Sequence, residues 1–516
     1  MTRAGSPASA PAAGIIALMR APLLLSPRLR EVEHAALAGL PAGTLMERAG
    51  TAVAMRAARL AGELPRATPI ALLVGPGNNG GDALVAVMRL RAWGYPATPW
   101  FLDAAPPRAA DAAAVRARWL AGGGELASLA ALPPTLAAAP AALVVDGLFG
   151  IGLTRPLAGA AASLADLLAA TRHPVLAIDL PSGLDADRGT AVGEDGGRVL
   201  AATETLTFLA DKPGLRTGVG PRYAGRITVD MLGVTIAAAA TDGETLDANL
   251  AASLVRRRDP LSHKGSFGAV LVLGGEPGMR GAALLAAGAA QAAGAGKTWM
   301  ACPGPDPFSA SQPHLMSRAF DADAAGADAV VIGCGLGRSR QAAERLARAL
   351  ADARPCVVDA DALGLVAADA ALEALLAGRS AATVLTPHPL EAARLLGCDT
   401  RQVQADRLAA ARRIAERHRA IVLLKGAGTV LASPHGRWAI NTTGSPALAI
   451  GGSGDVLAGL IGGLLAQAYP AWDAARLGAW LHGRAGDLWH RGHPHGAGLD
   501  PLGLIAHLPR AWPSSA

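Results

Sequence analysis

Short apolar runs alternate along the chain with longer stretches in which apolar residues recur every three or four positions. The runs lie at 70–74, 142–145, 175–178 and 205–209 in the first half, and at 269–273, 329–332, 357–358 and 383–385 in the second. Short buried strands separated by amphipathic helices are typical of βαβ units, in which helices cover both faces of a parallel sheet. The pattern therefore predicts two α/β domains.

A change of composition separates the two halves. Between residues 234 and 250 the chain becomes alanine-rich and then polar, and Thr241-Asp-Gly-Glu244 has the composition of a turn. A chain of 516 residues also exceeds the size at which one hydrophobic core keeps growing. We therefore expect two three-layer α/β/α domains, one over residues 1–240 and one over residues 241–516. About the first 20 residues are expected to be disordered.

Composition and charge narrow the class of protein. Apolar residues make up 51% of the chain, yet alanine dominates them and no run of about 18 apolar residues is present, so we expect no membrane span. The net charge of +6 comes from arginines scattered along the chain, and no basic stripe accompanies the sparse aromatic residues. This pattern argues against a nucleic-acid partner.

Cysteine usage and the N-terminal stretch bear on the compartment. The chain contains four cysteines without CxxC spacing, all in or beside apolar segments, as expected of reduced, buried and structural thiols. Pro11 and Arg20 interrupt the apolar stretch near the N-terminus, which argues against a secretory signal. We therefore expect a cytoplasmic protein.

Two glycine-rich turns stand between a strand and a helix, one in each half. They are Gly75-Pro-Gly-Asn-Asn-Gly-Gly-Asp82 and Gly451-Gly-Ser-Gly-Asp455. Glycine permits close approach to the backbone, and the first amides of a helix are unpaired donors at the positive end of its dipole, so phosphate is the expected ligand. Two alternatives stay open: each turn is only a tight connection, or Asp82 and Asp455 only stabilise the start of a helix.

In the first half, oxygen-bearing side chains gather where strands end. Asp146 and Asp179 directly follow two apolar runs, and ligands of open α/β sheets bind beyond the carboxyl ends of the strands. Together with Asn79 and Ser182 they offer only oxygen ligands, which suits a hard cation. Residues 179–185 could equally fold a Pro/Gly turn that binds nothing.

Three segments of the first half closely resemble the epimerase half of bifunctional NAD(P)H-hydrate repair enzymes, a Rossmann-like domain. They are the turn 75–82, Asp146-Gly-Leu-Phe-Gly-Ile-Gly-Leu-Thr-Arg-Pro156 and Ala177-Ile-Asp-Leu-Pro-Ser-Gly-Leu-Asp185. Ala83 is a departure, because the family usually carries glycine there.

The resemblance implies a potassium ion held by Asn79, Asp146 and Ser182. It also implies that the hydrated dinucleotide contacts Asn78, Asn79, Gly80, Gly81, Asp82, Gly150, Ile151, Gly152, Leu153, Thr154, Arg155, Pro156 and Asp179. Interconverting two epimers at the hydrated ring carbon needs a proton shuttle. Asp179 is our candidate for that acid/base.

In the second half, Asn441 to Leu457 joins a turn to the start of a helix. Backbone amides of residues 452–454 would form an anion hole for a transferring phosphoryl group, and Asp455 stands where it could take a proton from an attacking hydroxyl. The pattern of a Walker loop is absent. The turn is instead similar to the GxGD turn of the ribokinase-like superfamily.

Further segments resemble the ADP- or ATP-dependent NAD(P)H-hydrate dehydratase of that superfamily. They are Lys264-Gly-Ser-Phe-Gly268, Gly333-Cys-Gly-Leu-Gly337, Val358-Asp-Ala-Asp-Ala-Leu363, Thr386-Pro-His-Pro-Leu-Glu391 and Lys425-Gly-Ala-Gly-Thr429. The resemblance implies hydrate contacts at Gly335, His388 and Asp455, and Mg²⁺ on the nucleotide phosphates. It places the adenine nucleotide, ADP in most bacterial members, against Lys425, Gly426, Ala427, Gly428, Thr429 and Gly454.

Several positions in the second half leave alternatives. Ser445, Leu448 and Ser453 differ from the residues usual in the family. His388 could pack in a rigid strand-to-helix connection instead of meeting a substrate. The histidines near the C-terminus show no ligand pattern and are expected on a solvated surface; they are His482, His490, His493 and His495.

The two resemblances cover nearly the whole chain and imply repair of nicotinamide nucleotides. The first half would epimerise the R and S forms of NAD(P)HX, and the second would dehydrate the S form with ADP, giving AMP and phosphate. The expected partners are these small molecules and further copies of the chain. The alternatives are an ATP-dependent kinase of a small hydroxymethyl vitamin precursor and a non-catalytic nucleotide-binding protein.

Overall fold

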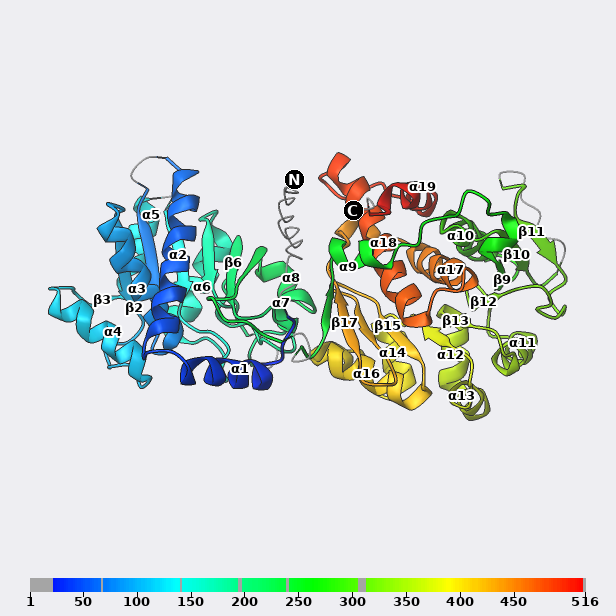
Figure 1. Ribbon diagram of the computed structural model, residues 1–516, viewed down its shortest axis with the longest axis horizontal. Helices are drawn as coiled ribbons and strands as arrows, with labels where there is room; N and C mark the ends of the chain where they lie inside the picture. The colour runs from blue at the N-terminus through cyan, green and yellow to red at the C-terminus, as the bar shows by residue number, and fades with distance from the viewer. Residues whose placement is uncertain are drawn as a thin grey trace, which may run out of the picture.

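The computed structural model describes residues 22–65, 68–139, 142–193, 197–237, 241–304 and 312–513, which two sheets organise (Figure 1). The expected N-terminal disorder concerns residues outside these ranges. Residue 240, where we expect the first domain to end, also lies outside them, so both expectations stay predictions. None of the helices in the described ranges is both long and apolar enough to cross a membrane.

The N-terminal domain is built on a parallel sheet. Within the described residues its order is β3-β2-β1-β4-β5-β6-β7, and every neighbouring pair is parallel. The strands are β1 (Ile70–Val74), β2 (Ala97–Phe101), β3 (Ala127–Ser128), β4 (Leu143–Gly147), β5 (Val175–Ile178), β6 (Glu204–Phe208) and β7 (Arg226–Asp230). The order reverses between β1 and β4, and a crevice opens at the carboxyl ends of such strands.

Helices cover both faces of this sheet. They are α1 (Ser26–Ala38), α2 (Thr44–Gly62), α3 (Asn78–Ala92), α4 (Ala110–Ala121), α5 (Leu132–Ala138), α6 (Gly159–Ala170), α7 (Pro213–Arg216) and α8 (Gly220–Tyr223). In β1, Ile70, Leu72 and Val74 belong to the core formed with α2, α3 and α4, whereas Ala71 and Leu73 belong to the core formed with α5 and α6. Because successive side chains point to opposite faces, a strand covered on both faces is apolar throughout, as the sequence shows.

The C-terminal domain is built on a longer mixed sheet. Within the described residues its order is β11-β10-β9-β12-β13-β14-β15-β16-β17-β8, parallel from β11 to β15, antiparallel from β15 to β17, and parallel again between β17 and β8. The strands are β8 (Glu244–Leu246), β9 (Ala269–Leu273), β10 (Lys297–Ala301), β11 (Met316–Arg318), β12 (Ala329–Ile332), β13 (Cys356–Val358), β14 (Thr383–Leu385), β15 (Ile421–Leu424), β16 (Val430–Ala432) and β17 (Trp438–Asn441).

Helices cover this sheet on both faces as well, which confirms the predicted α/β class. They are α9 (Ala248–Leu254), α10 (Arg280–Ala292), α11 (Arg340–Ala351), α12 (Ala360–Ala368), α13 (Ala370–Ala377), α14 (Pro389–Leu396), α15 (Thr400–Ala405), α16 (Arg407–His418), α17 (Ser453–Ala466), α18 (Ala471–Gly492) and α19 (Pro501–Ala511). Val270 and Val272 of β9 pack toward α10 and α17, and Leu271 and Leu273 toward α11 and α12. The segment 425–429, which resembles the dehydratase, connects the antiparallel pair β15 and β16.

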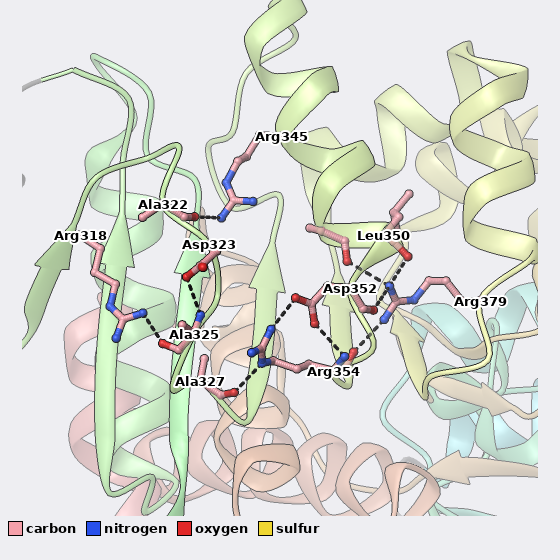
Figure 2. A network of polar contacts seen from close by, with 11 residues as sticks. Arg318, Ala322, Asp323, Ala325, Ala327, Arg345, Leu350, Asp352, Arg354 and Arg379 are labelled. Carbon is pink, nitrogen blue, oxygen red and sulfur yellow. Dashed lines mark hydrogen bonds and ion pairs between the residues drawn. The ribbon is translucent and has the colours of Figure 1, made fainter.

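Arginines hold together the loops that precede β13 and β14 (Figure 2). Arg379 donates to the carbonyl oxygens of Asp352 and Arg354, at 2.9 and 2.8 Å. Arg354 in turn donates from Nε to the carbonyl oxygen of Ala327, at 2.7 Å. These bonds satisfy backbone acceptors at the amino-terminal edge of the sheet, opposite the strand ends where ligands bind.

The two domains meet where α7 faces the β15–β16 connection (Figure 1). Thr217 Oγ1, directly after α7, donates to the carbonyl oxygen of Gly428 at 2.8 Å and accepts from Arg407 Nε at 3.0 Å. The Arg407 side chain is fully buried and also donates to the carbonyl oxygen of Leu424 at 3.0 Å. A Cβ on Gly428 would lie 1.7 Å from the carbonyl oxygen of Arg216, so this contact requires glycine.

Candidate active sites

A cavity of about 1140 Å³ opens at the carboxyl ends of β1, β2, β4 and β5 in the N-terminal domain. Most predicted substrate residues line it: Asn78, Asn79, Asp82, Gly150, Ile151, Gly152, Leu153, Thr154, Arg155, Pro156 and Asp179. A second cavity of about 760 Å³ lies beside it against α2 and α4 and contains none of these residues. The larger cavity, at the crevice that the strand order predicts, is therefore the candidate site.

Gly80 and Gly81 do not line this cavity. A Cβ on Gly80 would lie 2.0 Å from the carbonyl oxygen of Gly75, and a Cβ on Gly81 would lie 2.6 Å from Met46 Sδ. These two glycines let α3 pack against its own entry turn and against α2. Gly77, in contrast, faces open space. The glycine-rich turn thus combines packing glycines with one that leaves room beside the cavity.

Of the predicted cation ligands, Asn79 lines the cavity, whereas Asp146 and Ser182 do not. Asp146 Oδ1 accepts from Ser182 Oγ at 2.7 Å and Oδ2 from the Ser182 amide at 2.8 Å, and both residues are fully buried. Asn79 Nδ2 donates to the carbonyl oxygen of Ile178 at 2.9 Å, which leaves its Oδ1 free to ligate. Burial raises the pKa of Asp146 to about 6, although the bonds from Ser182 oppose the rise.

A potassium ion fits this donor set. The ligand atoms are oxygens, and Asp146 is a buried carboxylate with no Lys, Arg or His partner among the described residues. A monovalent cation would supply the missing charge without demanding the strict octahedron of Mg²⁺. Asn79, Asp146 and Ser182 are the residues that would hold it.

Asp179, which lines the cavity, forms an ion pair with the buried Lys212. Lys212 Nζ lies 2.7 Å from Asp179 Oδ1, and the lysine side chain is only 1% exposed. Asp179 has a φ of +65°, a conformation that is costly for a residue with a Cβ and that is found most often at functional sites. Lys212 also donates to the carbonyl oxygen of Phe208 at 3.2 Å, which fixes its ammonium beside the carboxylate.

Two residues of this site were not identified from the sequence. They are Lys212 and a further acidic residue, Glu33 of α1. Glu33 lines the cavity with Asp82 and Asp179. Burial and then the charges of Asp179 and Glu33 raise the pKa of Asp82 well above its ordinary value, and burial also raises the pKa of Glu33. Gly77 precedes α3 and Asp82 makes no cap bond, so the helix-cap interpretation of Asp82 finds no support.

In the C-terminal domain the acidic residues gather at the start of α17. One ligand atom from each of Cys334, Asp359 and Asp455 lies within 4.8 Å of the others. Lys425 Nζ is 2.9 Å from Asp359 Oδ1 and 3.9 Å from Glu391 Oε2. Although burial opposes its charge, the two carboxylates raise the pKa of Lys425. Lys425 is therefore a cation already held in place by protein carboxylates.

Asp455 lies in the first turn of α17 and makes no cap bond. Burial and the nearby charge of Asp359 raise its pKa to about 6, although a hydrogen bond from Cys334 and the charge of Lys425 oppose the rise. A carboxylate with such a pKa is a stronger base than an exposed aspartate and is still ionised at neutral pH. Its position and its pKa both suit a general base.

His388 serves the fold and also faces the site. Its Nδ1 accepts from the amides of Leu390 and Glu391, while Glu391 Oε2 accepts from the His388 amide at 2.7 Å, a reciprocal cap at the start of α14. The imidazole remains 46% exposed. Burial lowers the pKa of His388, so the ring is neutral at pH 7. The structural interpretation and the substrate contact are thus compatible.

The predicted nucleotide residues fall into two groups. A Cβ on Gly454 would lie 3.2 Å from Lys425 Nζ, so this glycine brings the start of α17 against the Lys425–Asp359 pair. Gly426 and Gly428 have positive φ and pack on Arg407 and Arg216, and Thr429 Oγ1 donates to the carbonyl oxygen of Gly426. Gly335 has a φ of +60° and lies beside the start of α10.

Magnesium fits this site only together with a nucleotide. Asp359 is occupied by Lys425, and burial raises the pKa of the Cys334 thiol well above its ordinary value, so that the thiol stays protonated. Mg²⁺ prefers oxygen and is usually bound by one or two carboxylates plus substrate phosphates. Because Lys425 holds Asp359 and Asp455 is the candidate base, the nucleotide phosphates would supply the main Mg²⁺ ligands.

Cys334 is free and buried as expected, and it also lies against Asp455. One sequence-based expectation needs correction. His482 was expected on a solvated surface; its Nε2 lies 2.9 Å from the carbonyl oxygen of Ser453 and 3.1 Å from Ser453 Oγ, at the start of α17. Burial lowers its pKa to about 4. Helix packing between α17 and α18, which the local sequence does not reveal, places it there.

The fold and these two sites define a two-domain α/β protein with a separate acid–base cluster at the strand ends of each domain. Residues 42–214 match the family model of the YjeF-related protein N-terminus, and residues 270–510 match that of NAD(P)H-hydrate dehydratase.

Relatives match across both halves. The chain is 36% identical over 471 residues to the bifunctional NAD(P)H-hydrate repair enzyme Nnr of Escherichia coli K12, covering 89% of this chain and 88% of the relative. It is 34% identical over 507 residues to the bifunctional NAD(P)H-hydrate repair enzyme of Leishmania major, covering 89% and 88%. The chain belongs to the family of bifunctional NAD(P)H-hydrate repair enzymes.

A solved structure resembles the C-terminal half. The ADP/ATP-dependent NAD(P)H-hydrate dehydratase of Bacillus subtilis, crystallised with ATP and Mg²⁺, is 30% identical, with a TM-score of 0.47, and the match covers 52% of this chain and 98% of that one.

Proposed function

We propose that the chain repairs hydrated nicotinamide nucleotides with both of its sites. The N-terminal domain interconverts the R and S forms of NAD(P)HX, and the C-terminal domain dehydrates the S form to NAD(P)H with ADP, releasing AMP and phosphate. The observation that supports this most strongly is the presence of both acid–base clusters in one chain that matches bifunctional repair enzymes over both halves.

The N-terminal site suits the epimerisation. The substrate carries a hydroxyl on a ring carbon next to the ring nitrogen. If Asp179 takes the hydroxyl proton, the carbonyl forms as the carbon–nitrogen bond breaks, and Asp179 returns that proton to the nitrogen while Lys212 holds its carboxylate in place. Reclosure on the other face, with both proton transfers reversed, gives the opposite epimer. The 2.7 Å contact with Lys212 supports this role, because it holds the Asp179 carboxylate at the edge of the cavity. Potassium on Asn79, Asp146 and Ser182 would neutralise the buried carboxylate.

The C-terminal site suits phosphoryl transfer to the same hydroxyl. Asp455 takes the hydroxyl proton, the oxygen attacks the β-phosphorus of ADP, and AMP leaves. The ring nitrogen then expels phosphate, and loss of a proton from the neighbouring carbon restores the ring of NAD(P)H. Amides at the start of α17 and the ammonium of Lys425 would stabilise charge on the transferring group, with Mg²⁺ on the phosphates.

A substitution pair tests the assignment. Asp179→Asn should bind the hydrate but lose epimerisation, whereas Asp455→Ala should lose dehydration and keep epimerisation. Unchanged turnover in either variant removes that residue from the mechanism. A cytoplasmic location and a homo-oligomeric state remain predictions from the sequence. The vitamin-precursor kinase is disfavoured because it gives the N-terminal cavity and its ion pair no role.

A further inference from the structure

The large N-terminal cavity extends well beyond the reacting residues. Its lining runs from Asp179, after β5, across the loops that follow β4 and β1 to the loop that follows β2. Neighbouring strands lie about 4.8 Å apart, so β2 is about 14 Å from β5. A dinucleotide whose nicotinamide ring meets Asp179 and whose diphosphate lies at the central loops therefore directs its adenosine toward β2.

The loop after β2 is held in a defined position. Arg116 of α4, which is buried, donates to the carbonyl oxygens of Ala104 and Ala105. Its guanidinium lies over the Phe101 ring, 5.6 Å from the centroid. Asp103 Oδ1 accepts from the Ala105 amide at 2.8 Å, which closes a turn. The loop thus presents its remaining polar groups to the cavity from a fixed backbone.

Two charged side chains of this loop line the cavity, Asp103 and Arg108. No described residue pairs with Arg108, which is exposed. In sheets with this strand order, an acidic residue after the second strand accepts bonds from the adenosine ribose, and a nearby arginine accommodates a phosphate on that ribose. The planar guanidinium suits a phosphate because it can donate two parallel bonds.

The other arginines of the cavity are placed for different contacts. Arg155 belongs to the loop after β4, and Arg30 of α1 approaches the carbonyl oxygen of Ile151 in that same loop at 3.5 Å. Both lie on the side of the sheet where the diphosphate and the nicotinamide would bind. Among the described lining residues, Arg108 is the cation on the adenosine side.

We infer that Arg108 recognises the 2′-phosphate of the NADPH-derived hydrate in the N-terminal site, so that this residue sets the preference for NADPHX over NADHX. The inference rests on the proposed epimerase function. Asp103, in the same loop, is the acceptor for the ribose hydroxyls of the NADH-derived hydrate. The loop therefore carries a group for each form of the substrate.

The test compares both substrates with full-length Arg108→Ala. Epimerisation is followed from pure R epimers by chromatography without ADP or ATP, so that the dehydratase site stays inactive. Loss of a charge-assisted contact should lower kcat/KM for NADPHX by roughly 10- to 100-fold, mainly through KM, and change that for NADHX by less than about twofold. Arg108→Lys should restore only part of the loss, because an ammonium cannot donate the two parallel hydrogen bonds of a planar guanidinium.

Arg172→Ala is the matched control. Arg172 is exposed in the loop before β5, at the opposite edge of the sheet, so the variant removes the same charge without touching the cavity. Its kcat/KM for both substrates should stay at the wild-type value. Equal losses for both substrates in Arg108→Ala, or no loss for either, overturn the inference. Wild-type protein that epimerises neither substrate overturns the proposed function instead.

Discussion

The two sites use an aspartate and a lysine in opposite ways. In the N-terminal site, Lys212 contacts the candidate acid/base Asp179 itself, at 2.7 Å. In the C-terminal site, Lys425 contacts a different carboxylate, Asp359, at 2.9 Å, and Asp455 is left with a raised pKa of about 6. An aspartate that is paired with a lysine suits a reaction in which the same carboxylate removes a proton and returns it. An aspartate without a lysine partner suits a general base that acts beside a phosphoryl group. The difference follows the chemistry proposed for each half.

The largest expected effect follows removal of the unpaired base. Asp455→Asn keeps the shape of the side chain but cannot accept the hydroxyl proton, so dehydration should fall by about 10³-fold. Initial rates of NADPH formation from S-NADPHX with ADP and Mg²⁺ give the measurement. Epimerisation in the same preparation is the control and should be unchanged. A loss below tenfold would show that another group serves as base.

Removing the paired lysine should have the next largest effect. Lys212→Met keeps most of the buried volume but removes the ammonium from Asp179, so epimerisation should fall by about 10²-fold while dehydration persists. Equal epimerase rates in the variant and the wild type would show that the ion pair between Lys212 and Asp179 has only a structural role.

Potassium should stabilise the N-terminal domain through Asp146. The pKa of Asp146 is raised to about 6, above its unfolded value of about 3.9, so without a cation its contribution to stability is full below pH 4 and is lost as the pH rises through 6. Bound K⁺ should reverse that loss, by about 2–3 kcal/mol at 100 times its dissociation constant. Thermal unfolding at pH 7.5 with potassium or a bulky organic cation measures it.

Asp146→Asn is the control for this effect. The amide is uncharged at pH 7.5, so the variant should unfold at the same temperature with either cation. A potassium effect of equal size in the variant would place the ion elsewhere.

A smaller effect is expected from the thiol beside Asp455. The Cys334 hydrogen bond lowers the pKa of Asp455, so Cys334→Ala should raise that pKa above about 6. Below this value the dehydratase rate falls tenfold per pH unit as the base is protonated, and the midpoint should move to higher pH in the variant. The pH profile of kcat/KM reports the shift. Cys356→Ala, in a buried strand away from the cluster, should leave the midpoint in place.

The smallest effect concerns the contact between the halves. Thr217→Val removes the hydroxyl that bonds Gly428 and Arg407, so the free energy of unfolding should fall by about 1 kcal/mol. Thr51→Val is the matched control within α2, and urea unfolding of both variants gives the comparison. Equal stabilities would show that water replaces the lost contact.

Strands that are continuous apolar runs, such as β1, β4, β5 and β6, and both glycine-rich turns could be located from the sequence, because these are local signals. The strands β2, β7 and β10 were missed, because polar and aromatic residues interrupt their apolar pattern. Asp146 and Asp179 could be placed near the turn from strand order alone, since the carboxyl ends of parallel strands share one edge. The role of Lys212 could not be predicted from the sequence, because it depends on a side chain that folds back across β6 to Asp179. The positions of Glu33 and His482 could not be predicted for a similar reason, since the packing of α1 and α18 places them at the sites.

The most direct test of the central claim follows NADHX repair to completion. An equal mixture of R and S epimers is given to the protein with K⁺, Mg²⁺ and ADP, and the absorbance of NADH is recorded until it stops changing. Two working sites predict full recovery of NADH, with Asp179→Asn slowing only the phase that consumes the R epimer. Recovery that stops at the S fraction with the wild-type protein, or no recovery with ADP or ATP, would contradict the account.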